Sequence, residues 1–81
     1  MNLTILTPDE EKFNGEVISV ALPGIDGKFQ ILKGHAPLVA ALGKGEVKVQ
    51  FASGETKFFG IAGGFVEVLN ESVSVLAKGT L

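Results

Sequence analysis

The sequence predicts a small all-β fold, either a sandwich or a barrel, and three features of its 81 residues support this. Turn-forming residues recur every several positions, and short segments rich in Val, Ile, Leu and Phe lie between them. Apolar and polar side chains alternate in several of these segments, as in strands whose successive side chains point to opposite faces. The 11 glycines disfavour helices, because each costs about 1 kcal/mol relative to alanine in a helix interior.

The N-terminal part of the chain combines one helical candidate with one apolar run. Pro8 to Lys12 has the features of a single helical turn, because proline suits a first helical position and Asp9 and Glu10 suit the positive end of a helix dipole. Residues 17–22 are almost all apolar, which is typical of a strand buried on both faces.

The segments that follow alternate more clearly. In residues 46–51 the polar side chains fall on one face and Val47, Val49 and Phe51 on the other, and residues 66–68 and 72–75 repeat the pattern. Gly63-Gly64 predicts a bulge or sharp bend where two backbones approach closely. We expect most of the following side chains to form the core: Val17, Val20, Leu22, Phe29, Ile31, Val47, Val49, Phe51, Phe58, Val66, Val68, Val73 and Val75.

Composition excludes several classes of function. The absence of cysteine removes disulfides, thiolate catalysis and most structural zinc sites. A formal net charge of −2, with seven lysines and no arginine, is unlike a nucleic-acid-binding protein. No apolar run is long enough to cross a bilayer, and the first residues lack the features of a signal peptide. We therefore expect one soluble intracellular domain over residues 1–81.

Candidate sites for chemistry are weak. His35 is the single histidine, and a lone histidine more often makes structural hydrogen bonds, the alternative being a contact at a partner surface. Pro37 favours extended backbone before it and places His35 where a loop enters a strand. Asp9-Glu10-Glu11 lacks the spacing of a calcium loop, and Gly43-Lys44-Gly45 precedes a strand pattern rather than the helix of a phosphate loop. We expect no catalytic residue, metal or cofactor.

A set of motifs spread over the whole chain carries more information. In order they are Thr7-Pro8, Phe13-Asn14-Gly15-Glu16-Val17, Leu22-Pro23-Gly24, Asp26-Gly27-Lys28-Phe29 with Ile31, Gly34-His35-Ala36-Pro37-Leu38, Gly63-Gly64-Phe65-Val66-Glu67-Val68 and Val73-Ser74-Val75-Leu76-Ala77. Their order and spacing resemble the epsilon subunit of bacterial F-type ATP synthases. The sequence departs from that pattern at Gln30 and Lys33, where relatives commonly have glycine and proline, and at Lys28, where a relative can carry an acidic residue.

This resemblance implies a flattened sandwich of two antiparallel sheets and a non-catalytic role. It implies a rotor subunit of the central stalk that links the gamma subunit to the membrane c-ring and supports the coupling of proton or sodium flow to ATP synthesis. Such a subunit lies at the cytoplasmic face of the bacterial inner membrane and touches the membrane only through the complex.

The resemblance also implies two contact surfaces. The c-ring contact is expected at the loop around residues 25–29 and the neighbouring histidine, with Asp26, Gly27, Lys28, Phe29 and His35. The gamma contact is expected on a different surface, with Thr7, Leu38, Val39 and Ala40. Val39 and Ala40 should point to opposite faces of a strand, and the alternative is a strand buried on both faces within the monomer.

Two other classes of protein compete with this interpretation. Biotinyl or lipoyl carrier domains are also small, acidic and all-β, and Asp26-Gly27-Lys28 is the nearest candidate for a modified lysine, although Gly27 separates the usual adjacent pair. A small enzyme is the third class, and no constellation of residues supports it. Longer relatives of the epsilon type carry two C-terminal helices that can inhibit rotation, and we expect residues 78–81 to provide neither such an arm nor an ATP site.

Overall fold

The computed structural model describes residues 1–79, and all regular structure in this range is β-strand. Thr80 and Leu81, part of the C-terminal segment considered above, lie outside the described residues. The strands are β1 (Asn2–Leu6), β2 (Glu11–Glu16), β3 (Ser19–Gly24), β4 (Gly27–Leu32), β5 (Leu38–Leu42), β6 (Gly45–Gln50), β7 (Thr56–Ile61), β8 (Gly64–Leu69) and β9 (Ser72–Ala77).

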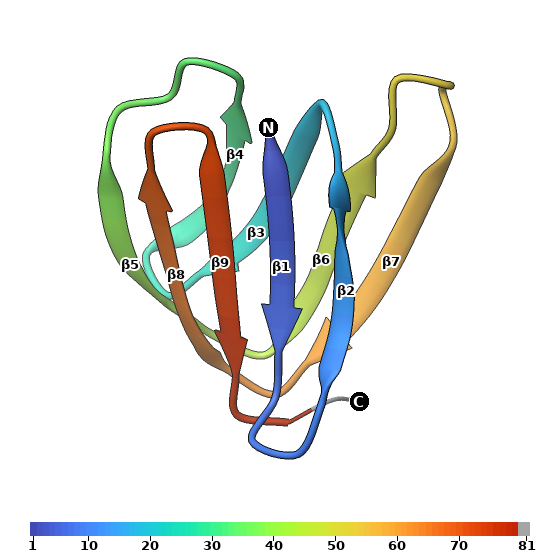
Figure 1. Ribbon diagram of the computed structural model, residues 1–81. Helices are drawn as coiled ribbons and strands as arrows, with labels where there is room; N and C mark the ends of the chain where they lie inside the picture. Colours follow the sequence, from blue (N-terminus) through green and yellow to red (C-terminus); the bar gives the residue numbers. More distant parts are fainter. Residues whose placement is uncertain (80–81) are drawn as a thin grey trace.

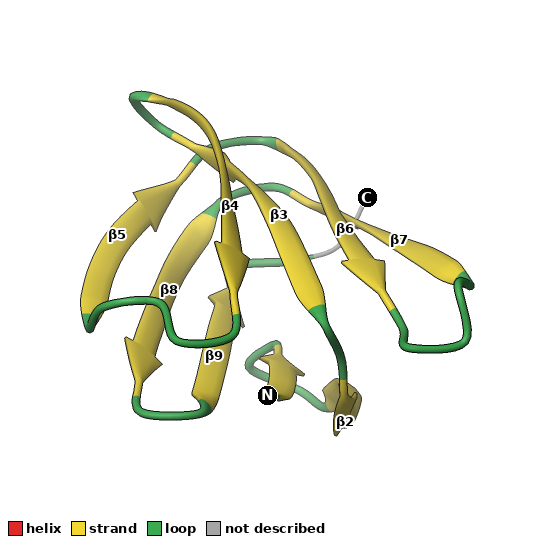
Figure 2. Cartoon of the chain, turned by 90° about the horizontal axis from the view of Figure 1, so that it is seen from above, coloured by secondary structure: helices red, strands yellow, loops and turns green. Residues whose placement is uncertain are grey.

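The strands form two layers that are joined at one corner (Figures 1 and 2). One layer has the order β2-β1-β9-β8-β5, and the other contains β4, β3, β6 and β7. The layers meet where Gly24 of β3 pairs with Leu42 of β5, so the hydrogen-bonded path is one folded sheet. All described strand pairs are antiparallel except β1 and β9, which are parallel. The all-β class is confirmed, but the two sheets are continuous and one pair is parallel.

Two paired segments, β5–β6 and β7–β8, run from one layer to the other at the corner. Leu42 pairs with Gly64 on one side of the corner and Gly45 pairs with Ile61 on the other, so β5–β6 and β7–β8 keep their register across it. Gly64 has a φ of 145°, and a Cβ there would overlap the main-chain carbonyl of Leu76. The predicted bend with close backbone approach at Gly63-Gly64 is confirmed.

The core lies between the inner faces of the two layers. Most of the predicted core residues are buried, but Phe29 and Phe51 are only half-buried and Phe58 is 55% exposed. Phe58 was assigned to the wrong face, because β7 directs Phe59 and Ile61 inward and therefore Phe58 outward. Ile18, which precedes β3, is 45% exposed, but within β3 the residues Ser19, Val20, Leu22 and Pro23 are buried, so the strand is covered on both faces as expected. The fully buried side chains that the sequence patterns missed are Leu3, Ile5 and Ile61.

The predicted helical turn at Pro8 to Lys12 is wrong. The segment is the turn between β1 and β2, and Lys12 is already part of β2. The Thr7 amide donates to the carbonyl oxygen of Glu10 at 2.9 Å, and the Glu10 amide donates to the Thr7 hydroxyl oxygen at 3.2 Å. A threonine hydroxyl that accepts a local amide bond in this way offers the backbone an alternative to helix.

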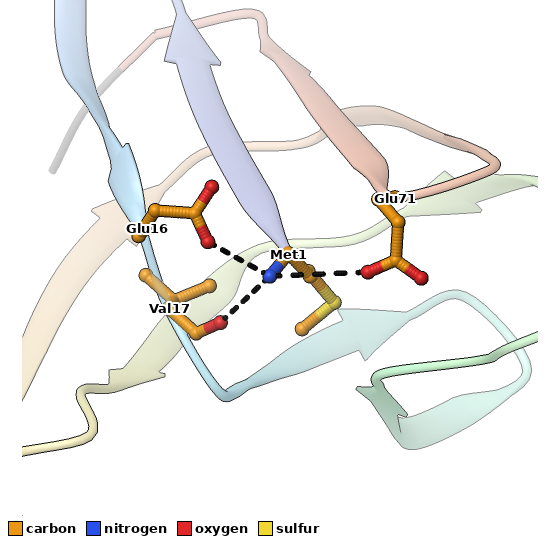
Figure 3. A network of polar contacts seen from close by, with 4 residues as sticks. All are labelled: Met1, Glu16, Val17 and Glu71. Carbon is orange, nitrogen blue, oxygen red and sulfur yellow. Dashed lines mark hydrogen bonds and ion pairs between the residues drawn. The ribbon is translucent and has the colours of Figure 1, made fainter.

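The amino group of Met1 joins three strands at one end of the first layer (Figure 3). It lies 2.9 Å from a carboxylate oxygen of Glu16 and 4.0 Å from one of Glu71, and it donates to the carbonyl of Val17 at 3.4 Å. Both carboxylates are exposed to solvent, so each ion pair contributes little, at most about 1 kcal/mol. The contacts nevertheless fix the start of β1 between β2 and β9.

Three phenylalanines fill the space between the two ends of the folded sheet, β2 and β7. The Phe13 ring lies 5.8 Å from the Phe51 ring and 5.6 Å from the Phe59 ring, centroid to centroid. The ammonium of Lys57 lies 6.0 Å above both the Phe13 and Phe51 rings. The cluster stabilises the sandwich on the side where no strand pairing joins β2 to β7 among the described residues.

Candidate interaction surfaces

The first candidate surface is the tip of the β3–β4 hairpin. Gly24 pairs with Gly27, and the two residues between them, Ile25 and Asp26, form the loop. Ile25 is 67% exposed, Asp26 and Lys28 are exposed, and neither charged side chain forms an ion pair with a described residue. Two free charges of opposite sign beside an apolar side chain can therefore contact a polar partner.

His35 does not lie beside this tip. The hairpin tip is at the start of β4 and His35 follows its end, about 20 Å away for six residues in extended conformation (Figure 1). The His35 amide donates to the carbonyl of Leu32 at 3.0 Å, and its Nδ1 donates to the carbonyl oxygen of Ala36 at 2.7 Å. His35 lies in the loop that enters β5, as predicted, but the expectation that it neighbours Asp26–Phe29 is wrong.

The side chains of β5 alternate between the two faces of the first layer. Val39 is 70% exposed, whereas Leu38 and Ala40 are half-buried and pack against the core. The prediction that Val39 and Ala40 point to opposite faces is confirmed. The alternative of a strand buried on both faces is wrong, because the outer face at Val39 is open to solvent.

The second candidate surface is a row of apolar side chains across the outside of the first layer. Leu6 of β1 pairs with Leu76 of β9, Leu76 with Phe65 of β8, and Phe65 with Ala41 of β5. Phe65 and Leu76 are 53% and 51% exposed. These four residues, which we call the apolar row, end at Thr7 on one side and approach Val39 on the other. An exposed continuous apolar stretch of this kind marks a contact surface.

The sequence-based interpretation assigned none of these four residues, Leu6, Ala41, Phe65 and Leu76, to the contact. A usable signal was present, because Val66, Val68, Val73 and Val75 occupy the inner face and the residues between them must point outward. An apolar residue at such an outward position predicts an exposed apolar surface.

A groove of about 390 Å³ separates the hairpin tip from β5. Ile25, Asp26, Gly27 and Phe29 line it from one side, and residues 38–41 line it from the other. The Ile25 amide donates to the carbonyl of Ala41 at 3.1 Å and holds the tip against the strand. The residues assigned to two separate surfaces therefore meet at one groove, with Thr7 and His35 lying apart from it.

The described residues show no group of three or more potential metal ligands. Within residues 1–79, no helix is long and apolar enough to cross a membrane. The two adjacent exposed surfaces, one apolar and one charged, are of the kind through which a small β domain binds other proteins.

Comparison with known proteins gives the family. Residues 1–81 match the model of the β-sandwich domain of the ATP synthase delta/epsilon chain. The chain is 47% identical over 76 residues to the ATP synthase epsilon chain of Chlorobium limicola and 46% identical to that of Chlorobaculum tepidum, covering 94% of this chain and 86% of each relative. The chain therefore belongs to the family of ATP synthase epsilon chains, and it is a non-catalytic subunit of that enzyme.

Solved structures agree with this assignment. A chain in the OSCP/F1/c-ring structure of the Euglena gracilis mitochondrial ATP synthase superposes with a TM-score of 0.91 and 26% identity, over 98% of this chain and 51% of that one. A chain of the central stalk and c-ring of the Tetrahymena thermophila enzyme superposes with a TM-score of 0.84 at 17% identity, over 99% and 64%, which shows the common fold. Neither the carrier nor the small-enzyme alternative is supported by these matches.

Proposed function

We propose that the chain is a subunit of the central stalk that holds the gamma subunit with one surface and the c-ring with another. It takes part in the coupling of ion flow to ATP synthesis by transmitting force between these two partners. The single observation that carries the proposal is the apolar row, because four apolar side chains in register on the outside of a sheet need a partner to cover them.

The gamma subunit is the proposed partner of the apolar row. Thr7 at one end and Val39 near the other belong to the predicted gamma contact, and the row connects them into one surface. Leu38 and Ala40 support this surface from the core side. Large apolar side chains at the centre of an interface carry most of its binding energy, so Phe65 and Leu76 are the expected anchors.

The c-ring is the proposed partner of the β3–β4 tip, with Asp26, Gly27 and Lys28 as its contacts and Phe29 supporting the loop. The polar, charged character of this loop fits the polar loops of a membrane ring better than a hydrophobic interface. His35, at the far end of β4, contributes to this contact only if the ring surface extends along the strand. The proposed location is the cytoplasmic face of a bacterial inner membrane, reached through the complex.

Two phenylalanines of nearly equal exposure provide a matched test. Phe65 lies in the apolar row and is 53% exposed, whereas Phe58 lies on the outside of the other layer and is 55% exposed. Binding of the isolated gamma subunit from the same organism is measured by calorimetry. We expect Phe65→Ala to weaken binding by about tenfold or more, and Phe58→Ala to change it by less than about twofold.

Thermal denaturation of both variants shows whether the fold survives the substitution. Equal effects of the two substitutions, or a larger effect of Phe58→Ala, would contradict the assignment of the gamma contact to the apolar row.

A further inference from the structure

The edge of β5 that faces the hairpin tip carries unused backbone groups. Alternate residues of a strand direct their N–H and C=O groups to opposite edges. The carbonyl of Ala41 accepts from the amide of Ile25, and the amide of Gly43 donates to the carbonyl of Pro23. Val39, Ala41 and Gly43 therefore direct their N–H and C=O groups to this edge. Among the described residues, the amide and carbonyl of Val39 and the amide of Ala41 have no hydrogen-bond partner.

The surroundings of this edge fit a peptide. The groove beside it holds about 390 Å³, and Phe29, Leu38 and Ala40 give it an apolar lining. Ile25 at 67% exposure and Val39 at 70% stand on its two rims. An apolar groove beside a strand edge with free donors and acceptors is the feature that peptides recognise by adding a strand.

Charge restricts the identity of the peptide. Among the described residues, Asp26 is the one charged residue that lines the groove, and the exposed Glu67 pairs with Val39 on the neighbouring strand. The two carboxylates favour a segment that carries a lysine or arginine. They disfavour a second copy of this chain, whose formal net charge is −2.

We propose that an extended segment of the gamma subunit adds to this edge as a short strand, bonds to the backbone of Val39 and Ala41, and places a cationic side chain beside Asp26. Asp26 lines the groove and would be shared by the two contacts, whereas Lys28 lies outside the groove lining and remains for the c-ring. The inference rests on the proposed gamma contact and specifies how that contact is made. The Ile25–Ala41 bond closes one end of the groove and β5 begins at Leu38, so the paired segment has about three residues.

Hydrogen exchange of single amides tests the strand addition directly. The chain is labelled with ¹⁵N, and exchange is followed by NMR with and without the isolated gamma subunit. In the free chain, the amides of Leu38 and Ala40 are protected by pairing with β8, whereas those of Val39 and Ala41 exchange rapidly. We expect gamma to slow exchange at Val39 and Ala41 by about tenfold or more.

Substitutions at Val39 separate its backbone from its side chain. Val39→Ala and Val39→Pro both shorten or alter the side chain, but only proline removes the amide donor, and an edge position whose N–H points away from the sheet tolerates proline. We expect Val39→Pro to weaken gamma binding about fivefold beyond Val39→Ala. Asp26→Asn should weaken it about threefold at low salt and less at high salt.

The outcomes distinguish the two proposals. If gamma binds and Phe65→Ala weakens binding, but exchange at Val39 and Ala41 is unchanged and Val39→Pro equals Val39→Ala, the strand addition is wrong and the proposed function stands. If gamma does not bind at all, the proposed function fails and the strand addition fails with it. Protection of these amides in a concentrated sample without gamma would identify a second copy of the chain as the occupant and overturn the proposal.

Discussion

Replacing Gly64 with alanine tests the corner that places β5 and β8 beside each other under the proposed gamma contact. A Cβ at this position would overlap the carbonyl oxygen of Leu76 and approach the Cα of Ala77 to 3.0 Å. Both are main-chain atoms of β9, so they can move only if the terminal pair between Gly64 and Ala77 opens. The φ of 145° is also unfavourable for alanine.

The expected magnitude follows from these two causes. A backbone conformation of this kind costs about 1–3 kcal/mol for a residue with a side chain. Opening the end pair removes hydrogen bonds that contribute about 0.5–1.5 kcal/mol each. We expect a loss of about 3 kcal/mol, against a total of about 4–12 kcal/mol for a domain of this length. The melting temperature should fall by about 12 °C or more.

Gly54 supplies the matched control, because its φ is also positive, at 94°, but an added Cβ would meet no atom within 4 Å. Gly54→Ala should therefore cost only the backbone term, about 1–2 kcal/mol. Urea denaturation followed by circular dichroism measures both variants. If Gly64→Ala is no more destabilising than Gly54→Ala, the close approach of β8 and β9 at the corner is not the reason for glycine.

Two further predictions concern the core and the ring contact. Phe51→Ala should destabilise the chain by about 2 kcal/mol, because Phe51 packs against Phe13 between the two ends of the sheet. Phe58→Ala should cost less than about 1 kcal/mol, because the side chain of Phe58 points outward from β7. Urea denaturation measures both losses of stability, and equal losses would contradict the outward facing of Phe58. In the assembled enzyme, a cysteine that replaces Lys28 should crosslink to a cysteine in the polar loop of the c subunit, whereas one that replaces Ser53 should not. The opposite result would show that the ring contact does not lie at the β3–β4 tip.

Alternation predicted the buried face correctly where polar and apolar residues strictly alternate along the strand. Val47, Val49 and Val73 were assigned to the core because each lies between polar neighbours, and all three are buried. It failed at Phe58, because β7 contains two adjacent phenylalanines and the local pattern does not say which one points inward. The pairing of β7 with β6 decides that question, and such pairing is not visible in a local pattern.

Features that depend on distant pairing were not predictable in the same way. The parallel pair joins β1, the first strand, to β9, the last described strand, and no local sequence pattern predicts this pairing. The apolar row takes one residue from each of four strands, so it exists only once their register is known.

The candidate site was predicted in part. The turn at Asp26-Gly27 and the opposite facing of Val39 and Ala40 followed from residue chemistry and alternation. The position of His35 did not, because the few residues that separate it from the tip form a whole strand and carry it to the other end of the sheet (Figure 1).

Ion pumping by reconstituted enzyme tests the central claim that this chain links the gamma subunit to the c-ring. Inverted membrane vesicles from a strain lacking the subunit are supplied with the remaining F1 subunits and the purified chain, and ATP-driven pumping is followed by a fluorescent probe. We predict that the chain restores pumping and that Phe65→Ala restores it less well at the same concentration, while Phe58→Ala behaves as the unchanged chain. Vesicles that bind the chain and hydrolyse ATP, but pump no better than vesicles without it, would contradict the account.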